Sequence, residues 1–238
     1  MRTRDNVFAK KIMYAIGIVS ILMITLSVLP IWQVTKIIVK DSQYYSEEDI
    51  KKVLKLEGEP LWGMSKKKLK EQLKKLPYVE DSQIDYSFPG KIQICLIEKV
   101  PYGYVPFMGT YLCIDEKGQV IEQVNSVVQK LPIIRGLVFN AFKIGEVLPL
   151  ESEDALLIAV ELINILKKYN YTQKVTGIDI YNLEQIHLYV DNLDVIIGNI
   201  QHFEEKLQWL IKIHETHDMG VLNLSQIPNG QVVLSPIE

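Results

Sequence analysis

Hydrophobic residues dominate one long stretch near the N-terminus. No charged residue occurs from Ile12 to Thr35, and Lys11 and Lys36 bound the stretch. As a helix, this stretch would be about 36 Å long, enough to cross a hydrocarbon core of about 30 Å. The pattern predicts a transmembrane helix over residues 12–35, with Trp32 near one membrane interface.

Basic residues precede the apolar stretch. Arg2, Arg4, Lys10 and Lys11 outnumber the single acid, Asp5. Under the positive-inside rule, residues 1–11 form a cytoplasmic tail and everything after Lys36 is exported. A cleaved signal peptide is the alternative, but its apolar region is shorter and ends in a small-residue cleavage site. Residues 29–32 (Leu-Pro-Ile-Trp) lack such a site. We therefore expect an uncleaved anchor.

The next region, residues 36–101, alternates between strand and helix patterns. Ser46 precedes three acids, which is typical of a helix N-terminus, and Asp49 stands where a capping box usually has Glu or Gln. Leu69, Leu73 and Leu76 lie on one face of a second helix that starts at Ser65 and ends before Pro77. The predicted order is strand (34–39), helix (46–57), helix (65–76), strand (79–86) and strand (92–96). This predicts a small α+β domain with both helices on one face of a sheet.

Residues 102–238 predict a second, mixed and sheet-rich domain. Apolar stripes indicate helices over Glu153–Tyr169 and Phe203–His214. The turn Asp115-Glu116-Lys117-Gly118 separates two strands, and Pro228-Asn229-Gly230 separates the last two. The predicted strands are 111–114, 120–121, 175–181, 185–190, 194–197, 221–224 and 231–234.

The order of these short motifs resembles the FtsQ/DivIB family of bacterial cell-division proteins. The motifs are Ser46-Glu47-Glu48-Asp49-Ile50, Leu76-Pro77-Tyr78-Val79, Phe88-Pro89, Glu98-Lys99-Val100-Pro101 and Leu131-Pro132-Ile133-Ile134-Arg135-Gly136. Lys99 replaces the family's usual arginine, and Asn223 stands where many members have aspartate. The resemblance implies a transmembrane helix, a POTRA domain of β-α-α-β-β order and a β domain.

Composition adds few constraints. Charged residues make up 23% of the chain, hydrophobic residues 48%, and the net charge is −3. The chain is therefore globular in its bulk and lacks the basic balance of a nucleic-acid binder. Cys95 and Cys113 are too few for a disulfide-dense scaffold or a four-cysteine zinc site, although one bridge between them stays open.

Candidate chemistry is sparse. The Ser-x-x-Lys motif of penicillin-binding enzymes is matched by Ser65-Lys66-Lys67-Lys68. The companion motifs of those enzymes are missing, so a helix cap followed by solvated lysines is favoured. His214 and His217 are three apart, unlike the zincin spacing, and no third ligand is evident. The carboxylate pairs Asp115/Glu116 and Asp191/Asp194 fall at turns. We expect no enzyme activity, cofactor, metal site or small-molecule substrate.

Without catalytic residues, an exported sheet-rich protein acts through its surfaces. A terminal strand offers an edge to which a partner can add a strand. The family resemblance implies the same, with FtsL-like and FtsB/DivIC-like division proteins as partners and septal peptidoglycan synthesis as the process organised, at the septum of the bacterial cell membrane. The residues we expect to contact a partner are Leu222, Leu224, Val232, Val233 and Leu234. Core packing is the alternative role for all five.

The second predicted helix carries a basic face. Lys66, Lys67, Lys70 and Lys74 are the residues we consider for contact with an anionic surface, either lipid or wall polymer, although a merely solubilising face is the simpler reading. Two other functions stay open. One is a membrane-anchored cell-wall enzyme, for which no residue set is found. The other is an envelope sensor or chaperone-like accessory that binds exported chains.

Overall fold

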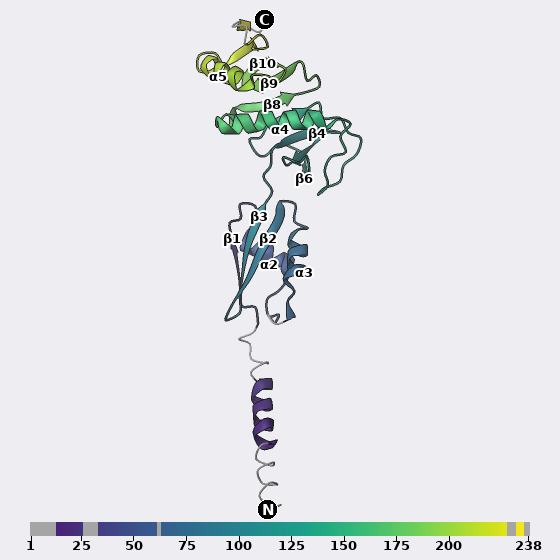
Figure 1. Cartoon of the computed structure of the whole chain (residues 1–238), viewed down its shortest axis with the longest axis vertical. Coiled ribbons are helices and arrows are strands. Elements are labelled where there is room, and N and C mark those ends of the chain that lie inside the picture. The colour runs from purple at the N-terminus through teal and green to yellow at the C-terminus, as the bar shows by residue number, and fades with distance from the viewer. Residues whose placement is uncertain (1–12, 26–32, 61–62, 228–231, 236–238) are drawn as a thin grey trace, which may run out of the picture. The chain divides into compact units, whose positions relative to one another are not determined.

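A computed structural model describes residues 13–25, 33–60, 63–227 and 232–235 (Figure 1). The chain divides into two compact units, Met1–Glu98 and Lys99–Glu238. Residues 13–25 are helical. The predicted span over 12–35 lies partly outside the described residues, and none of the helices inside them has the length and apolarity needed to cross a membrane.

The first unit contains the predicted strand, helix, helix, strand, strand order. Its elements are β1 (Lys36–Lys40), α2 (Glu47–Leu54), α3 (Lys66–Leu73), β2 (Val79–Ser87) and β3 (Lys91–Glu98). The sheet order is β1-β3-β2, with β1 parallel and β2 antiparallel to the central strand β3. Leucines and isoleucines of both helices share one core with all three strands. The prediction of a β-α-α-β-β module is confirmed.

The N-terminus of α2 is fixed by a capping box. The backbone N–H of Asp49 donates to Ser46 Oγ at 3.2 Å, and the backbone N–H of Ser46 donates to Asp49 Oδ2 at 3.1 Å. The shorter aspartate thus reaches back as Glu or Gln usually does. The helix then buries Ile50 and Leu54 in the core.

The second helix is shorter than its sequence pattern predicts. The leucine spacing extends to Leu76, but α3 ends at Leu73. The backbone N–H of Lys75 donates to the Gln72 carbonyl, and that of Leu76 donates to the Leu73 carbonyl. These bonds span three residues instead of four, so the chain before Pro77 forms 3-10 turns and not α-helix. Leu76 still packs against the core from this turn, which is why its spacing resembles that of a helix.

The second unit is a nine-stranded sheet with two helices. Its strands are β4 (Gly103–Phe107), β5 (Thr110–Ile114), β6 (Val120–Val124), β7 (Ile133–Arg135), β8 (Val175–Asp179), β9 (Ile186–Val190), β10 (Asn192–Gly198), β11 (Met219–Asn223) and β12 (Val233–Ser235), and its helices are α4 (Glu153–Lys168), α5 (Phe203–His214) and the short 3-10 helix η3 (Thr172–Lys174). The sheet order is β12-β11-β10-β9-β8-β7-β4-β5-β6.

Strand β4 was not predicted. It contains Pro106, and its first three residues are all buried, so it shows no alternation of exposed and buried positions. The predicted final strand 231–234 also shifts, because β12 begins at Val233. The predicted turn Pro228-Asn229-Gly230 and Gln231 lie outside the described residues.

One row of residues forms the inner face of this sheet. Its members face one another across neighbouring strands: Ile134, Ile178, Leu188, Val195, Leu222 and Leu234. They belong to the same core as Ala159, Leu162 and Leu166 of α4 and Leu207 and Leu210 of α5. Because strand residues alternate between faces, the adjacent row lies on the opposite face. That outer row is Arg135, Asp179, His187, Ile196, Asn223 and Val233.

Candidate functional site

The two ends of the nine-stranded sheet differ. At the β6 end, residues 145–147 lie against the strand. The N–H of Val120 donates to the Glu146 carbonyl at 2.9 Å, and the N–H of Gly145 donates to the Val120 carbonyl at 2.8 Å. Gln119 and Val147 form a single antiparallel backbone pair beside them. At the other end, β12 pairs with β11, and no strand of the described residues pairs with its outer side. The outer side of β12 is therefore the candidate site for a partner strand.

The register of β12 decides which side chains a partner would meet. Leu234 lies opposite Leu222 in the inner row, while Val233 lies opposite Asn223 in the outer row. Val233 is 55% exposed. Leu234 is half-buried and packs against the core. The side chains of a strand added beside β12 would thus lie next to Val233 on the outer face of the sheet and next to Leu234, at the edge of the core, on the inner face.

The five residues predicted for partner contact have different environments. Leu222 and Leu224 are fully buried, so their side chains pack in the core, the alternative considered for them. Val232 and Leu234 are partly buried against that core. Only Val233 of the five is largely exposed. The side chains of Leu222 and Leu224 are therefore not available at the surface, because the core encloses both of them.

Asn223 shapes the chain directly after β11. Its Oδ1 accepts hydrogen bonds from the backbone N–H of Ser225 at 2.9 Å and from Ser225 Oγ at 2.7 Å. An Asp or Asn oxygen commonly bonds two residues ahead in this way and begins a turn. An aspartate carboxylate, which the family resemblance implies at this position, could accept the same bonds, so the departure at Asn223 keeps this local geometry.

Polar side chains gather on the outer face of the sheet, where sequence patterns did not indicate a site. His187 Nδ1 lies 2.7 Å from Asp194 Oδ1, and the Arg135 guanidinium lies 5.7 Å from the centre of the Tyr189 ring. Burial, followed by the charges of Asp194 and Asp179, raises the pKa of Tyr189, while Arg135 opposes this shift. The sequence feature that could have indicated this polar face is the alternation in Ile186–Val190, where His187 and Tyr189 stand between buried apolar residues.

Most lysines predicted for anionic contact face carboxylates of β2. Lys66 Nζ lies 3.3 Å from Asp85 Oδ1, and Lys70 and Lys74 lie 3.7 Å and 3.4 Å from Asp81. The backbone N–H of Ser82, followed by these two ammonium groups, lowers the pKa of Asp81. Lys67 is exposed and has no ion pair among the described residues. Contact with an anionic surface remains a prediction for these lysines.

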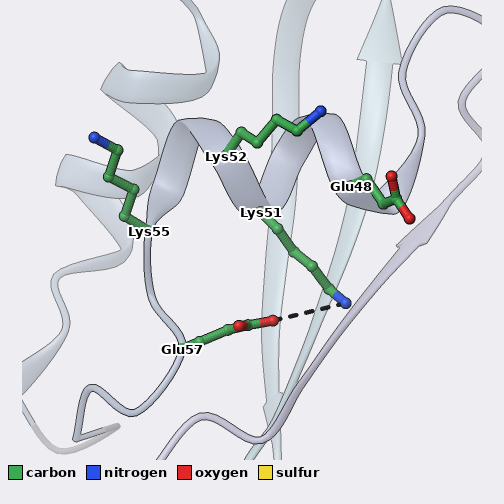
Figure 2. Close-up of a pocket in the computed structure, with 5 residues that line it drawn as sticks. All are labelled: Glu48, Lys51, Lys52, Lys55 and Glu57. Carbon is green, nitrogen blue, oxygen red and sulfur yellow. Dashed lines mark ion pairs between the residues drawn. The ribbon is translucent and has the colours of Figure 1, made fainter.

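A hollow of about 470 Å³ lies against α2, lined by Glu48, Lys51, Lys52, Lys55 and Glu57. Lys51 points to Glu57, with Nζ and Oε1 3.8 Å apart. Figure 2 shows the ammonium groups of Lys52 and Lys55 pointing away from this pair and from each other. Because the three cations do not converge on one point, the hollow is not built to hold an anion.

The residues weighed for catalysis do not assemble into an active site. Ser65 is the N-cap residue of α3 without a side-chain cap hydrogen bond. His214 lies between Tyr171 Oη at 2.7 Å and Asp191 Oδ2 at 3.2 Å, whereas His217 bonds to Thr216. Among the described residues, no group of three His, Cys, Asp or Glu side chains could hold a metal ion. Cys95 is half-buried in β3 of the first unit, and Cys113 is buried in β5 of the second.

Fold and surface together define a two-domain α+β protein with a POTRA-type first unit and an open sheet edge in its second. The FtsQ-type POTRA domain model matches residues 33–99, and the C-terminal model of cell division protein FtsQ/DivIB matches residues 103–228. This chain belongs to the FtsQ/DivIB family of cell division proteins.

Similar proteins have the same family name. The chain is 28% identical to the cell division protein DivIB of Clostridium botulinum strain Hall over 206 residues, covering 86% of this chain and 80% of the relative. It is 25% identical to DivIB of Clostridium tetani over 196 residues, covering 82% and 74%. For DivIB of Listeria monocytogenes the identity is 26% over 208 residues, covering 86% and 74%. These relatives span both structural units.

Proposed function

We propose that this chain is a non-enzymatic, single-pass scaffold of the bacterial division complex. Its exported part binds FtsL-like and FtsB/DivIC-like proteins at the septum and so helps to organise septal peptidoglycan synthesis. The observation that carries the proposal is the outer side of β12, where no described strand pairs. Membership in a family of cell division proteins supports the same function.

Strand addition is the binding mode that this edge favours. Backbone N–H and C=O groups along an open edge supply affinity, and alternate side chains supply specificity. Val233 is the exposed side chain of the edge, and Leu234 anchors it to the core. A partner strand with apolar residues at alternate positions would cover Val233 on the outer face.

Attachment to a membrane is supported by the helix over residues 13–25. Its large apolar side chains are between 57% and 68% exposed, among them Met13, Ile16, Ile18, Leu22 and Ile24. Apolar side chains exposed all round a helix are typical of a helix surrounded by lipid. The basic residues before it favour an N-terminus inside the cell, which makes the protein a type II membrane protein.

The test is a binding titration of the full-length chain, held in lipid nanodiscs, against exported segments of FtsL-like and DivIC-like proteins. Val233→Glu places a charge on the outer side of β12 and should weaken binding about tenfold or more, or about 1.4 kcal/mol. Val128→Glu is the matched control, because Val128 is 79% exposed in the loop after β6. We expect it to leave binding unchanged.

Two outcomes would contradict the proposal. Equal binding by wild type and Val233→Glu would remove β12 from the interface. No binding of either segment, alone or mixed, would favour the accessory that handles exported chains.

A further inference from the structure

The end of the first unit where the chain enters is held together by backbone hydrogen bonds. The N–H groups of Thr35 and Lys36 donate to the carbonyl of Gly90 at 2.7 Å and 3.2 Å, and the N–H of Val34 donates to Glu59 at 2.9 Å. Gly90 belongs to the turn between β2 and β3. This turn therefore lies directly against the residues at which the apolar stretch ends.

The contact between the turn and the entering chain is tight. Gly90 has a φ of 62°, and a Cβ atom there would lie 2.4 Å from the Gln33 carbonyl and 2.8 Å from Thr35 Oγ1. Thr35 Oγ1 also donates to the Gly90 carbonyl at 3.2 Å. No side chain separates the turn from residues 33–36, so the turn cannot move far from them while the unit stays folded.

The turn presents an aromatic residue beside two lysines. Phe88 is 66% exposed. Lys36 and Lys91 are exposed and face each other in register across β1 and β3. Like charges directly opposite on a sheet destabilise it. Neither lysine belongs to an ion pair within the part of the chain that the structure describes, so their paired charge is available to an anion.

The N-terminus of α3 lies at the same end. Tyr86, near the end of β2, donates from Oη to the Met64 carbonyl at 3.4 Å, and Lys66 bonds to Asp85 at 3.3 Å. Lys67 and Lys68 follow in the first turn of α3 and are exposed. The Glu59 carbonyl accepts the hydrogen bond from Val34 of the entering chain, and the Glu57 carboxylate pairs with Lys51.

We propose that this end of the first unit binds the headgroups of anionic lipids in the membrane that anchors the chain. We name it the turn surface and define it as Lys36, Lys67, Lys68, Phe88 and Lys91. Aromatic side chains favour the membrane interface, and basic residues close to an anionic bilayer are attracted to it. The inference rests on the proposed membrane anchor.

Covalent continuity favours a bilayer as the occupant over wall polymer. If the span ends near Thr35, the bonds to Gly90 hold the turn within a few residues of the membrane surface. Electrostatic attraction acts over about 8 Å at physiological salt, which suits a surface held at this distance. Lipid contact would restrict the tilt of the first unit on its anchor.

The test uses the full-length chain in vesicles. In a Cys95→Ser background, Phe88→Cys carries an environment-sensitive fluorophore, since Cys113 is fully buried. Vesicles contain phosphatidylcholine with or without phosphatidylglycerol, plus a lipid with a nitroxide quencher on its headgroup. A fluorophore at Gln43→Cys is the positional control, because Gln43 is exposed at the opposite end of β1. We expect strong quenching at position 88 and little at position 43.

Charge variants test the role of the lysines. Lys36→Glu combined with Lys91→Glu should reduce the phosphatidylglycerol-dependent quenching about twofold or more. Lys40→Glu combined with Lys75→Glu is the matched control, with the same charge change at the other end of the unit, and should leave quenching unchanged. Added salt should weaken the quenching as the charge variants do.

Three results would overturn the inference. The first is a chain that floats with the vesicles but shows no quenching at position 88, which contradicts the turn surface and leaves the anchor intact. The second is equal quenching with and without phosphatidylglycerol, which contradicts recognition of anionic headgroups. The third is a chain that does not float at all, which contradicts the anchor itself, and hence the membrane part of the proposed function as well.

Discussion

Ser42 Oγ donates a hydrogen bond of 2.6 Å to the carboxylate of Glu98, across 56 residues of sequence. The same carboxylate accepts from the backbone N–H of Gln43 at 2.8 Å and of Tyr44 at 3.3 Å. Glu98 thus ends β3 and also holds the loop between β1 and α2. This gives a physical role to the first residue of the Glu-Lys-Val-Pro motif, one of the motifs that carry the family resemblance.

Loss of the Glu98 carboxylate should loosen that loop. We expect Glu98→Ala to lower the free energy of unfolding of the first unit by about 1–3 kcal/mol, since charge-assisted hydrogen bonds would be lost. Hydrogen exchange at the amides of Gln43 and Tyr44 measures the effect. Glu71→Ala, at an exposed position of α3, should leave exchange there unchanged. Unaltered protection in Glu98→Ala would show that the loop is held by other contacts.

Gly90 should tolerate no side chain. A Cβ would clash with the Gln33 carbonyl, and the positive φ disfavours any L residue. We expect Gly90→Ala to destabilise the first unit by about 2 kcal/mol or more. Gly58→Ala separates the two causes, because Gly58 has a φ of 82° but no atom lies within 4 Å of the position that a Cβ would take there. Equal losses of stability in thermal unfolding would argue against the clash.

Lys206 is a buried amine in α5. It is 2% exposed, and its Nζ donates to the Asn199 carbonyl at 2.9 Å. Burial lowers the pKa of Lys206, so the unfolded chain binds more protons between that lowered value and the ordinary one. Stability should therefore rise as pH increases through this window. Lys206→Met should remove the rise and stabilise the second unit by about 1 kcal/mol at pH 7.

Denaturant unfolding between neutral pH and about pH 10 would measure this gain, because an unperturbed lysine titrates near the upper limit. Lys212→Met, in the last turn of the same helix, is the comparison for a less buried lysine. If Lys206→Met were less stable than wild type at every pH, the bond to Asn199 would outweigh the cost of the buried charge.

Tyr171 should control alkaline unfolding of the second unit. Its hydroxyl is hydrogen-bonded to His214, and burial, followed by the charge of Asp191, raises the pKa of Tyr171. The folded state thus keeps its proton where the unfolded state loses it, so stability should fall as pH rises above about 10. Tyr171→Phe should flatten this fall and cost about 1 kcal/mol below it. Tyr181→Phe, at a residue 74% exposed, should show neither effect in pH-dependent thermal unfolding.

Elements with a strong local pattern were predictable from the sequence. α5 matches its predicted bounds, and the capping box at Ser46 and Asp49 forms as the sequence pattern indicated. β4 was missed because Gly103, Tyr104 and Val105 are all buried and give no alternation. Its pairing with β5 on one side and with β7 on the other is what defines it as a strand.

The candidate site was only partly predictable. The sequence indicated a terminal strand, but five apolar residues cannot be divided between core and surface until their register is known. Pairing with β11 puts Leu234 in the inner row and Val233 in the outer row. The lysines of α3 could not be matched to Asp81 and Asp85 either, because those ion pairs depend on how the helix packs beside β2.

The unequal ends of the nine-stranded sheet limit how copies of this chain can assemble. Head-to-tail stacking would need β12 of one copy to pair with β6 of the next, but residues 145–147 already occupy part of the β6 side. Pairing of these two edges would therefore require residues 145–147 to leave β6, which disfavours an open-ended filament of copies through this sheet. Within this sheet, the outer side of β12 is thus the edge at which a further strand can pair without displacing a described segment.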